Sequence, residues 1–279
     1  MSKENYNKIQ YSLYLEMEYR LDYKRNGDTD MEFEKKTAII TGAASGMGFL
    51  CSKCFAEQGG HVVMADVNPD TLKKCVEEIN AIHPDCAIGV VCDVRDYEQV
   101  CHVRDEAVRV YGSIDLLVNF AGGAEIRMLN AGGMEFPDVP IEVYDWGIDV
   151  NLKGQMYFDH AVMKQMREQN SGVIINIGSI TGEEGCTGNI AYSASKSAAM
   201  NGLTKSVAMY GGKYGVRCCC VAPGPVLTRE AMANMKTLQG RACEPQEIVD
   251  LVLYLASDKA AFITGINVLI DGGRHVMPR

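Results

Sequence analysis

The chain has 279 residues, of which 27 are lysine or arginine and 36 are aspartate or glutamate, so its formal net charge is −9. This acidic balance argues against nucleic-acid binding, because a protein that neutralises phosphates needs a basic surface. With 47% hydrophobic and 23% charged residues the composition is that of a globular protein, which excludes disorder as the dominant state.

Membrane and secretory segments are not expected. No part of the sequence approaches the run of about 18 apolar residues that a membrane helix needs, and residues 1–30 are polar. We therefore expect no membrane contact and a cytoplasmic location. The eleven cysteines fit a reducing compartment as small buried thiols. Cys51 and Cys54 form a Cys-x-x-Cys pair, but no second pair stands at zinc spacing, so we expect packing there and no metal site.

Residues 1–34 differ from the rest of the chain. Ile9, Leu13, Met17 and Leu21 are spaced by four, as on one face of an amphipathic helix. An exposed flexible arm is the alternative. We expect an N-terminal extension over residues 1–34 and a single domain over residues 35–279.

From residue 36 onward, short apolar runs rich in β-branched residues alternate with longer stretches of helical periodicity. The runs are residues 37–40, 61–65, 87–91, 114–119, 172–177, 216–222 and 266–270. Strands with helices between them predict right-handed crossovers and a parallel sheet that is covered on both faces. The predicted fold class is α/β, a doubly wound parallel sheet of seven strands in a Rossmann fold.

The first predicted strand leads into a glycine-rich turn, residues 41–48, and then into a helical segment. Such a turn lets the backbone approach a pyrophosphate, whose charge is met by free N–H groups and by the helix dipole. The residues expected to contact a dinucleotide in this turn are Gly42, Ser45, Gly46, Met47 and Gly48.

Asp66 ends the second predicted strand, 18 positions after Gly48. A carboxylate at this place can accept hydrogen bonds from the adenosine ribose hydroxyls and repels a 2′-phosphate. The residues beside it in the sequence and in the glycine-rich turn include no lysine or arginine. NAD(H) is therefore predicted as the cofactor in preference to NADP(H). The alternative role for Asp66 is a helix N-cap.

Tyr192 and Lys196 lie four residues apart in a helical stretch, so both side chains project from one face. An unperturbed tyrosine, with a pKa of about 10, is a poor base at neutral pH. A neighbouring ammonium and a positively charged nicotinamide favour the phenolate and make it a usable proton acceptor. Ser179 ends the preceding predicted strand, at the sheet edge where ligands bind.

These motifs together resemble the classical short-chain dehydrogenase/reductase family, over residues 36–273. The matching elements, in order, are the Thr41–Gly48 turn, Cys92-Asp93-Val94, Asn119-Phe120-Ala121-Gly122, Asn151, Ser179, Tyr192-x-x-x-Lys196, Pro223-Gly224 and Asp271-Gly272-Gly273. Phe120 departs from the family, which usually has a second asparagine that braces neighbouring strands.

The resemblance implies a role for each matching residue. Tyr192 would exchange a proton with the substrate oxygen, and Ser179 would hold that oxygen. Lys196 would bind the nicotinamide ribose and lower the pKa of Tyr192, while Asn151 would anchor a water that connects the lysine to solvent. The further cofactor contacts implied are Asp93, Val94, Asn119, Ala121, Gly122, Pro223, Gly224, Val226 and Thr228.

Two segments bear on the substrate. Residues 122–146 are longer than is usual in the family and residues 228–248 are shorter. Their apolar residues are Met128, Leu129, Met134, Phe136, Met232, Met235 and Leu238. An apolar flap and a short cover suit a bulky hydrophobic alcohol or ketone, such as a hydroxysteroid or bile acid.

Other functions stay open at this point. A 3-oxoacyl thioester reductase and a polyol or sugar dehydrogenase are the enzymatic alternatives, and a dinucleotide-binding sensor or scaffold is the non-enzymatic one. A hydrolase is disfavoured because the sequence has no Gly-x-Ser-x-Gly motif. The resemblance also implies that the helices after Tyr192 pair between subunits of a homotetramer or homodimer.

Overall fold

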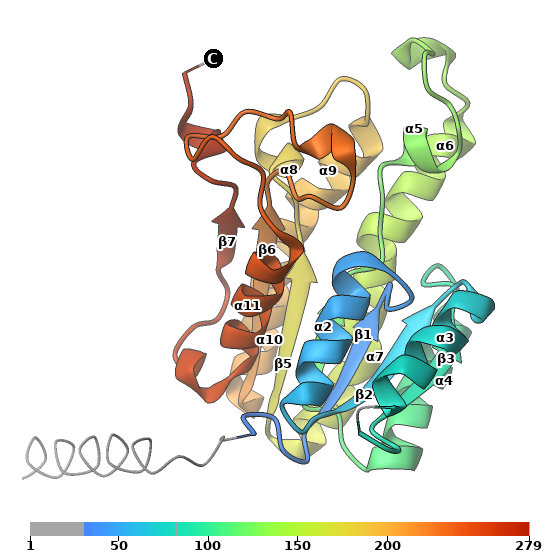
Figure 1. Ribbon diagram of the computed structural model, residues 1–279, viewed down its shortest axis with the longest axis vertical. Coiled ribbons are helices and arrows are strands. Elements are labelled where there is room, and N and C mark those ends of the chain that lie inside the picture. Colours follow the sequence, from blue (N-terminus) through green and yellow to red (C-terminus); the bar gives the residue numbers. More distant parts are fainter. Residues whose placement is uncertain (1–30, 82, 279) are drawn as a thin grey trace, which may run out of the picture. The chain divides into compact units, whose positions relative to one another are not determined.

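The computed structural model describes residues 31–81 and 83–278, and the fold class is confirmed. Seven parallel strands form one sheet in the order β3-β2-β1-β4-β5-β6-β7 (Figure 1). They are β1 (Thr37–Thr41), β2 (His61–Asp66), β3 (Ala87–Val91), β4 (Leu116–Asn119), β5 (Gly172–Ile177), β6 (Val216–Pro223) and β7 (Asn267–Ile270). Every predicted run is a strand, with ends shifted by two residues at most.

Helices connect the strands. They are α2 (Gly46–Glu57), α3 (Pro69–Asn80), α4 (Tyr97–Tyr111), α5 (Glu125–Met128), α6 (Ile141–Ile148), α7 (Gly154–Gln169), α8 (Thr181–Glu184), α9 (Ile190–Ala198), α10 (Thr204–Gly211) and α11 (Pro245–Ala256). π-helical turns at Asp149–Lys153 and Ala199–Leu203 join α6 to α7 and α9 to α10. Within the described part of the chain, no helix is both long enough and apolar enough to span a membrane.

Successive strand residues face opposite sides of the sheet, and each side has its own core. In β1, Ala38 and Ile40 belong to the cluster that α2, α3 and α11 complete. Ile39 faces the other way, into the cluster formed with α4, α7 and α10. All three side chains are fully buried, as a parallel sheet covered on both faces requires. This arrangement is the doubly wound one that the sequence predicts.

Residues 32 and 33 pack on the domain. The Phe33 ring stacks on Phe55 of α2 with centroids 4.5 Å apart, and Glu32 pairs with Lys259 at 2.6 Å. The predicted extension, residues 1–34, includes both residues, so its last part contributes to the domain core. Residues 1–30, with the predicted helix or arm, lie outside the described residues.

The strand order places a crevice at the carboxyl ends of β1 and β4. From β1 the chain moves outward through β2 and β3, and from β4 it moves outward on the other side through β7. The loops that follow β1 and β4 therefore diverge, which leaves room for a ligand between them.

Candidate active site

Glycines shape the turn between β1 and α2. Gly42 has a φ of +65°, and a Cβ at this residue would lie 2.9 Å from the backbone nitrogen of Ala121. A Cβ on Gly48 would lie 2.3 Å from the carbonyl oxygen of Gly42, so a larger residue would push α2 away from β1. Helix α2 begins at Gly46. Its free N–H groups therefore lie close to the crevice, where they can bind an anion.

A cleft of about 400 Å³ opens beside this turn. Most of the predicted cofactor contacts line it: Gly42, Ser45, Gly46, Met47, Gly48, Asp66, Asp93, Val94, Ala121, Gly122 and Thr228. The other predicted contacts are not among its lining residues: Asn119, Tyr192, Lys196, Pro223, Gly224 and Val226. A cleft walled by a glycine turn, a helix N-terminus and a carboxylate fits a dinucleotide.

The carboxylate of Asp66 ties the glycine-rich turn to the end of β2. Its Oδ2 accepts a hydrogen bond from the Ala44 N–H at 3.0 Å, and its Oδ1 accepts one from the Asn68 N–H at 2.9 Å. Each oxygen keeps a second lone pair that a ribose hydroxyl could use. The N-cap of α3 is Asn68, which accepts from the Thr71 N–H at 3.1 Å, so the alternative role considered for Asp66 is not observed.

Arg95 is a cationic residue in the cleft that inspection of the sequence around Asp66 did not identify. It pairs with Asp93, whose two carboxylate oxygens both lie 3.0 Å from the arginine Nε. Hydrogen bonds from Arg95 hold the pKa of Asp93 below its usual range. The positive charge of Arg95 is therefore already matched within the protein.

Asn119 points away from the cleft. Its side chain is buried and donates to Asp159 Oδ1 and to Asn176 Oδ1, both at 2.9 Å. We predicted that Asn119 lies along the cofactor path, whereas its side chain instead connects β4 to β5 and α7. Burial raises the pKa of Asp159 to about 7. The hydrogen bonds from Asn176 and Asn119 act in the opposite direction but are the weaker influence.

Asn151 lies in the π-helical turn before α7 and holds the segment that follows β4. Its Nδ2 donates to the carbonyls of Gly123 (2.9 Å) and Gly147 (2.8 Å), and its Oδ1 accepts from the Gly123 N–H (2.9 Å). Its main-chain carbonyl accepts from Gln155 at 2.9 Å. The side chain therefore fixes the backbone beside the cleft, and its role in anchoring a water stays a prediction.

Ser179 lies two residues after the end of β5, and Tyr192 and Lys196 lie on α9. The Ser179 hydroxyl is a hydrogen-bonding neighbour of Tyr192. The Ser179 hydroxyl lies 2.8 Å from that of Thr181. Lys196 lies one turn after Tyr192, with its Nζ 5.6 Å from the centroid of the tyrosine ring, and donates to the Ile177 carbonyl at 2.7 Å. A Cβ on Gly122 would lie 3.4 Å from this Nζ, so Lys196 reaches the wall of the cleft.

Burial shifts the pKa values of both residues on α9. It lowers the pKa of Lys196 to about 8, because the charged ammonium loses its hydration. It raises the pKa of Tyr192, while the neighbouring Ser179 hydroxyl and the positive charges of Arg127 and Arg229 lower it. The lowering by Lys196 that the resemblance implies stays a prediction.

Glu125 belongs to the site, although sequence reasoning did not identify it. It is fully buried on α5, where Oε1 accepts from the Ala191 N–H at 3.0 Å and Oε2 accepts from the Tyr192 N–H at 3.1 Å. N–H groups in the first turn of a helix have no partner within that helix. Glu125 therefore fixes the start of the helix that carries Tyr192 and Lys196. No local signal reveals this contact, because the partners lie 66 and 67 residues away.

Comparison with known proteins agrees with this geometry. The family model described as Enoyl-(Acyl carrier protein) reductase matches residues 42–275. Trans-4-hydroxycyclohexanecarboxylate dehydrogenase of Sinomonas cyclohexanicum is 38% identical over 86% of this chain and 92% of its own. The 7alpha-hydroxysteroid dehydrogenase of Bacteroides fragilis is 32% identical over 86% and 95%. The solved structure of levodione reductase superposes with a TM-score of 0.80, at 27% identity, over 88% of this chain and 99% of its own.

The chain belongs to the short-chain dehydrogenase/reductase family. It is therefore an oxidoreductase that acts on CH–OH groups and binds a nicotinamide dinucleotide. The motifs on which the resemblance rested are those that the structure gathers at the carboxyl edge of the sheet.

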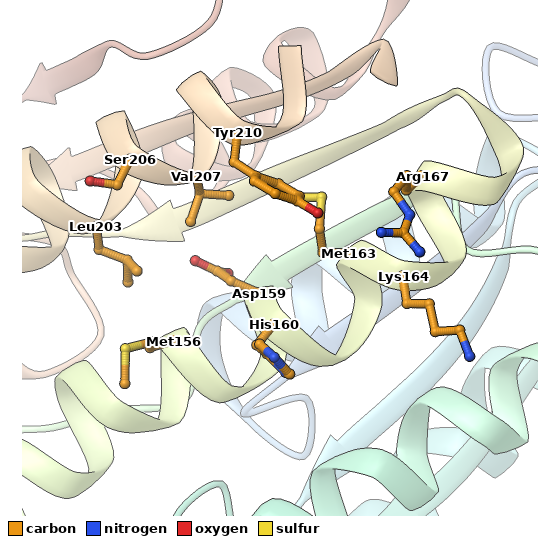
Figure 2. A pocket seen from close by; sticks show the side chains of 10 residues that line it. All are labelled: Met156, Asp159, His160, Met163, Lys164, Arg167, Leu203, Ser206, Val207 and Tyr210. Carbon is orange, nitrogen blue, oxygen red and sulfur yellow. The ribbon is translucent and has the colours of Figure 1, made fainter. Parts of the chain in front are cut away.

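A second, larger hollow of this short-chain dehydrogenase/reductase lies away from that chemistry. It has a volume of about 540 Å³ and lies between α7 and α10, whose side chains face each other across it (Figure 2). Apolar side chains such as Met156, Met163 and Val207 line it together with the polar Asp159 and His160. None of the predicted catalytic or cofactor residues does so.

Proposed function

We propose that the protein is an NAD(H)-dependent dehydrogenase that transfers a hydride between the cofactor and the carbinol carbon of a bulky hydrophobic alcohol or ketone. A hydroxysteroid or bile acid is the substrate class proposed. The observation that carries the proposal is the convergence of Ser179, Tyr192 and Lys196 beside the dinucleotide cleft. A sensor or scaffold has no need for these three groups together.

Each of the three residues has a distinct task. When bound, NAD⁺ supplies the hydride acceptor. In the oxidation direction Tyr192 accepts the hydroxyl proton of the substrate as the carbon gives up its hydride, and Ser179 donates a hydrogen bond that holds the substrate oxygen. Lys196 binds the nicotinamide ribose and favours the tyrosinate, and the proton continues to solvent along the side of the site held by Asn151. Reduction of the ketone runs the same steps in reverse.

Asp66 supports the preference for NAD(H), because its carboxylate repels a 2′-phosphate and the charge of Arg95 is matched by Asp93. In Asp66→Ala the ratio of kcat/KM with NADP⁺ to that with NAD⁺ should rise by about 10-fold or more, as expected for removal of a like charge. Asp70→Ala, on the exposed first turn of α3, is the matched control. An unchanged ratio in Asp66→Ala would contradict the role assigned to this carboxylate.

The segment after β4 supports a hydrophobic substrate. Its apolar side chains Met128, Leu129, Met134 and Phe136 are all exposed in the structure. Two relatives carry hydroxysteroid and hydroxycyclohexanecarboxylate in their names, which favours a hydroxyl on a ring. The test is NAD⁺-dependent oxidation of a panel of hydroxysteroids, bile acids and polyols, with oxoacyl thioesters in the reverse direction. Turnover confined to polyols or to thioesters would replace the proposed substrate class.

We also propose that copies of the chain pair through α7 and α10, as a homodimer or a homotetramer. The hollow between these helices is mainly apolar, and Met156 and Tyr210 at its rim are exposed. Exposed apolar surface of this kind is typical of subunit interfaces. Met156→Glu should lower the mass measured by analytical ultracentrifugation, and a monomeric wild type would contradict the proposal.

A further inference from the structure

Two arginines lie near the active site, and neither has an acidic partner among the residues that the structure describes. Arg127 lies on α5 and Arg229 in the loop after β6, and both are exposed. We infer that these two guanidinium groups bind an anionic group of the substrate, which is therefore a hydroxy acid or oxo acid with its carboxylate close to the reacting carbon. The inference rests on the proposed dehydrogenase function and revises its substrate class, from a hydroxysteroid or bile acid to a smaller ring alcohol that carries a carboxylate.

The position of Arg127 follows from two adjacent glycines. A Cβ on Gly122 would lie 3.4 Å from Lys196 Nζ, and a Cβ on Gly123 would lie 3.4 Å from Arg127 Nη2. The ammonium and the guanidinium therefore lie close to neighbouring residues of one short segment, whose Gly122 lines the cleft. The absence of a side chain at each glycine makes room for these two cationic groups.

Arg229 lies in the loop after β6. It directly follows Thr228, which lines the cleft. Among the described residues, its side chain makes one hydrogen bond, from Nη2 to the sulfur of Met232 at 3.6 Å. After the effects of burial and of the Ser179 hydroxyl, the charges of Arg127 and Arg229 are the next largest influences on the pKa of Tyr192, and both lower it. Two segments separated by about a hundred residues therefore place positive charge near enough to Tyr192 to lower its pKa.

The other arginines in the described part of the chain all have a protein partner. Five pair with carboxylates: Arg95, Arg104, Arg109, Arg241 and Arg274. Arg217 donates to three backbone carbonyls, and Arg167 stacks on Tyr214. The protein has a net charge of −9, so carboxylates are in excess. Arg127 and Arg229 nevertheless have no carboxylate partner among the described residues, which indicates that they bind an anion from outside the protein.

Glu125, two residues before Arg127, does not neutralise these charges. Its two carboxylate oxygens accept from the N–H groups of Ala191 and Tyr192, and its side chain is fully buried. Residues two apart on a helix do not face each other, so the exposed Arg127 points elsewhere. The planar guanidinium fork suits a carboxylate, which it can bind through two parallel hydrogen bonds.

The experiment compares acids with their uncharged counterparts. The probes are 2-, 3- and 4-hydroxycyclohexanecarboxylate and the primary amide of each, assayed with saturating NAD⁺ on the pH plateau of each variant. The plateau is needed because both arginines also influence Tyr192. The wild type should prefer at least one acid to its amide, and this preference should shrink as the salt concentration rises.

Arg127→Met and Arg229→Met should each lower kcat/KM for the preferred acid by about 10- to 100-fold, mainly through KM, as expected for loss of a charged hydrogen bond. Activity on the matching amide should change by less than about two-fold, within the range of a surface substitution. Arg109→Met on α4 is the control, because its ion pair with Glu106 is exposed and away from the site.

Four outcomes would overturn the inference. An equal loss on acid and amide would mean that the arginines act on structure, and a matching loss of NADH affinity, measured by fluorescence titration, would mean that they bind the cofactor phosphates. Wild-type turnover without any preference for the acids would refute the anionic substrate while leaving the dehydrogenase intact. If neither acids nor amides react, and the wider panel of alcohols fails as well, the proposed function falls together with the inference.

Discussion

The two halves of the active site are built in different ways. The dinucleotide half consists of backbone and glycines, such as Gly42 after β1 and Gly48 in the first turn of α2, next to the fully buried strand β1. The substrate half consists of exposed side chains on connecting segments, including Met134, Phe136 and Arg229. A backbone-built site follows from the fold and suits any protein that shares it. A side-chain-built site is particular to this chain, and specificity therefore resides there.

The largest expected effect is on the rate of the chemical step, with cofactor binding unchanged. Tyr192→Phe should lower kcat by about 10³-fold, because a positioned acid–base group contributes rates of this order. The dissociation constant of NADH, measured by fluorescence titration, should stay unchanged. Tyr210→Phe on the distant α10 is the control. Retention of hydride transfer near the wild-type rate would show that Tyr192 is not the proton carrier.

A substitution in the glycine-rich turn should instead impair cofactor binding. Gly48→Ala should raise the dissociation constant of NADH by about 10- to 100-fold, since a Cβ 2.3 Å from the Gly42 carbonyl forces α2 outward at the cost expected for overpacking. Gly212→Ala, where an added Cβ meets nothing within 4 Å, should bind NADH normally. Unaltered NADH affinity in Gly48→Ala would contradict the view that backbone packing builds this half of the site.

Glu125 on α5 binds the start of α9, and its substitution should have a smaller effect on the reaction. Its negative charge raises the pKa of Tyr192. Glu125→Gln should therefore move the rising limb of the pH–rate profile for alcohol oxidation to lower pH, because the phenol loses its proton more easily. It should also lower the free energy of unfolding by about 1–3 kcal/mol, since a buried N–H of α9 loses its charged acceptor. The control is the exposed Glu142→Gln on α6. A loss of stability without a shift of the rising limb of the pH–rate profile would show that Glu125 has a purely structural role.

The last prediction concerns the buried polar cluster of Asn119, Asp159 and Asn176 and changes stability alone. Asp159 keeps its proton up to a pH of about 7 in the folded chain, whereas in the unfolded chain it loses it at about pH 4. Between these values the native state binds more protons, so its contribution makes the free energy of unfolding fall as pH rises, by at most about 1.4 kcal/mol per pH unit.

Asp159→Asn should remove this slope in urea unfolding measured from pH 4 to 7. Asp149→Asn, at a half-exposed ion pair, should leave the slope in place. An identical slope in wild type and Asp159→Asn would show that the carboxyl group is charged throughout this range. Loss of the slope in Asp159→Asn would show that the buried interior, unlike the exposed substrate half, holds a carboxyl group in its neutral form.

The sheet, its seven strands and most of the cofactor cleft were predictable from the sequence. Continuous apolar runs indicate strands that are buried on both faces, and the carboxyl ends of parallel strands meet at one edge whatever the connecting helices contain. For this reason Asp66, Ser179 and Tyr192 could be assigned to one site from their places after or between strands. The spacing of Tyr192 and Lys196 is local, and the helix preserves it.

Tertiary structure alone decided the direction and the partners of individual side chains. Asn119 occupies the predicted strand end but turns inward to Asp159. Glu125 fixes a helix 66 residues away, and Arg127 and Arg229, on two separate segments, both lower the pKa of Tyr192. Sequence periodicity reports the environment of a single element, whereas a contact between distant segments depends on how the elements pack. The sequence by itself therefore determined the fold and the reaction class, and the packing of its loops determined the charges that the substrate meets.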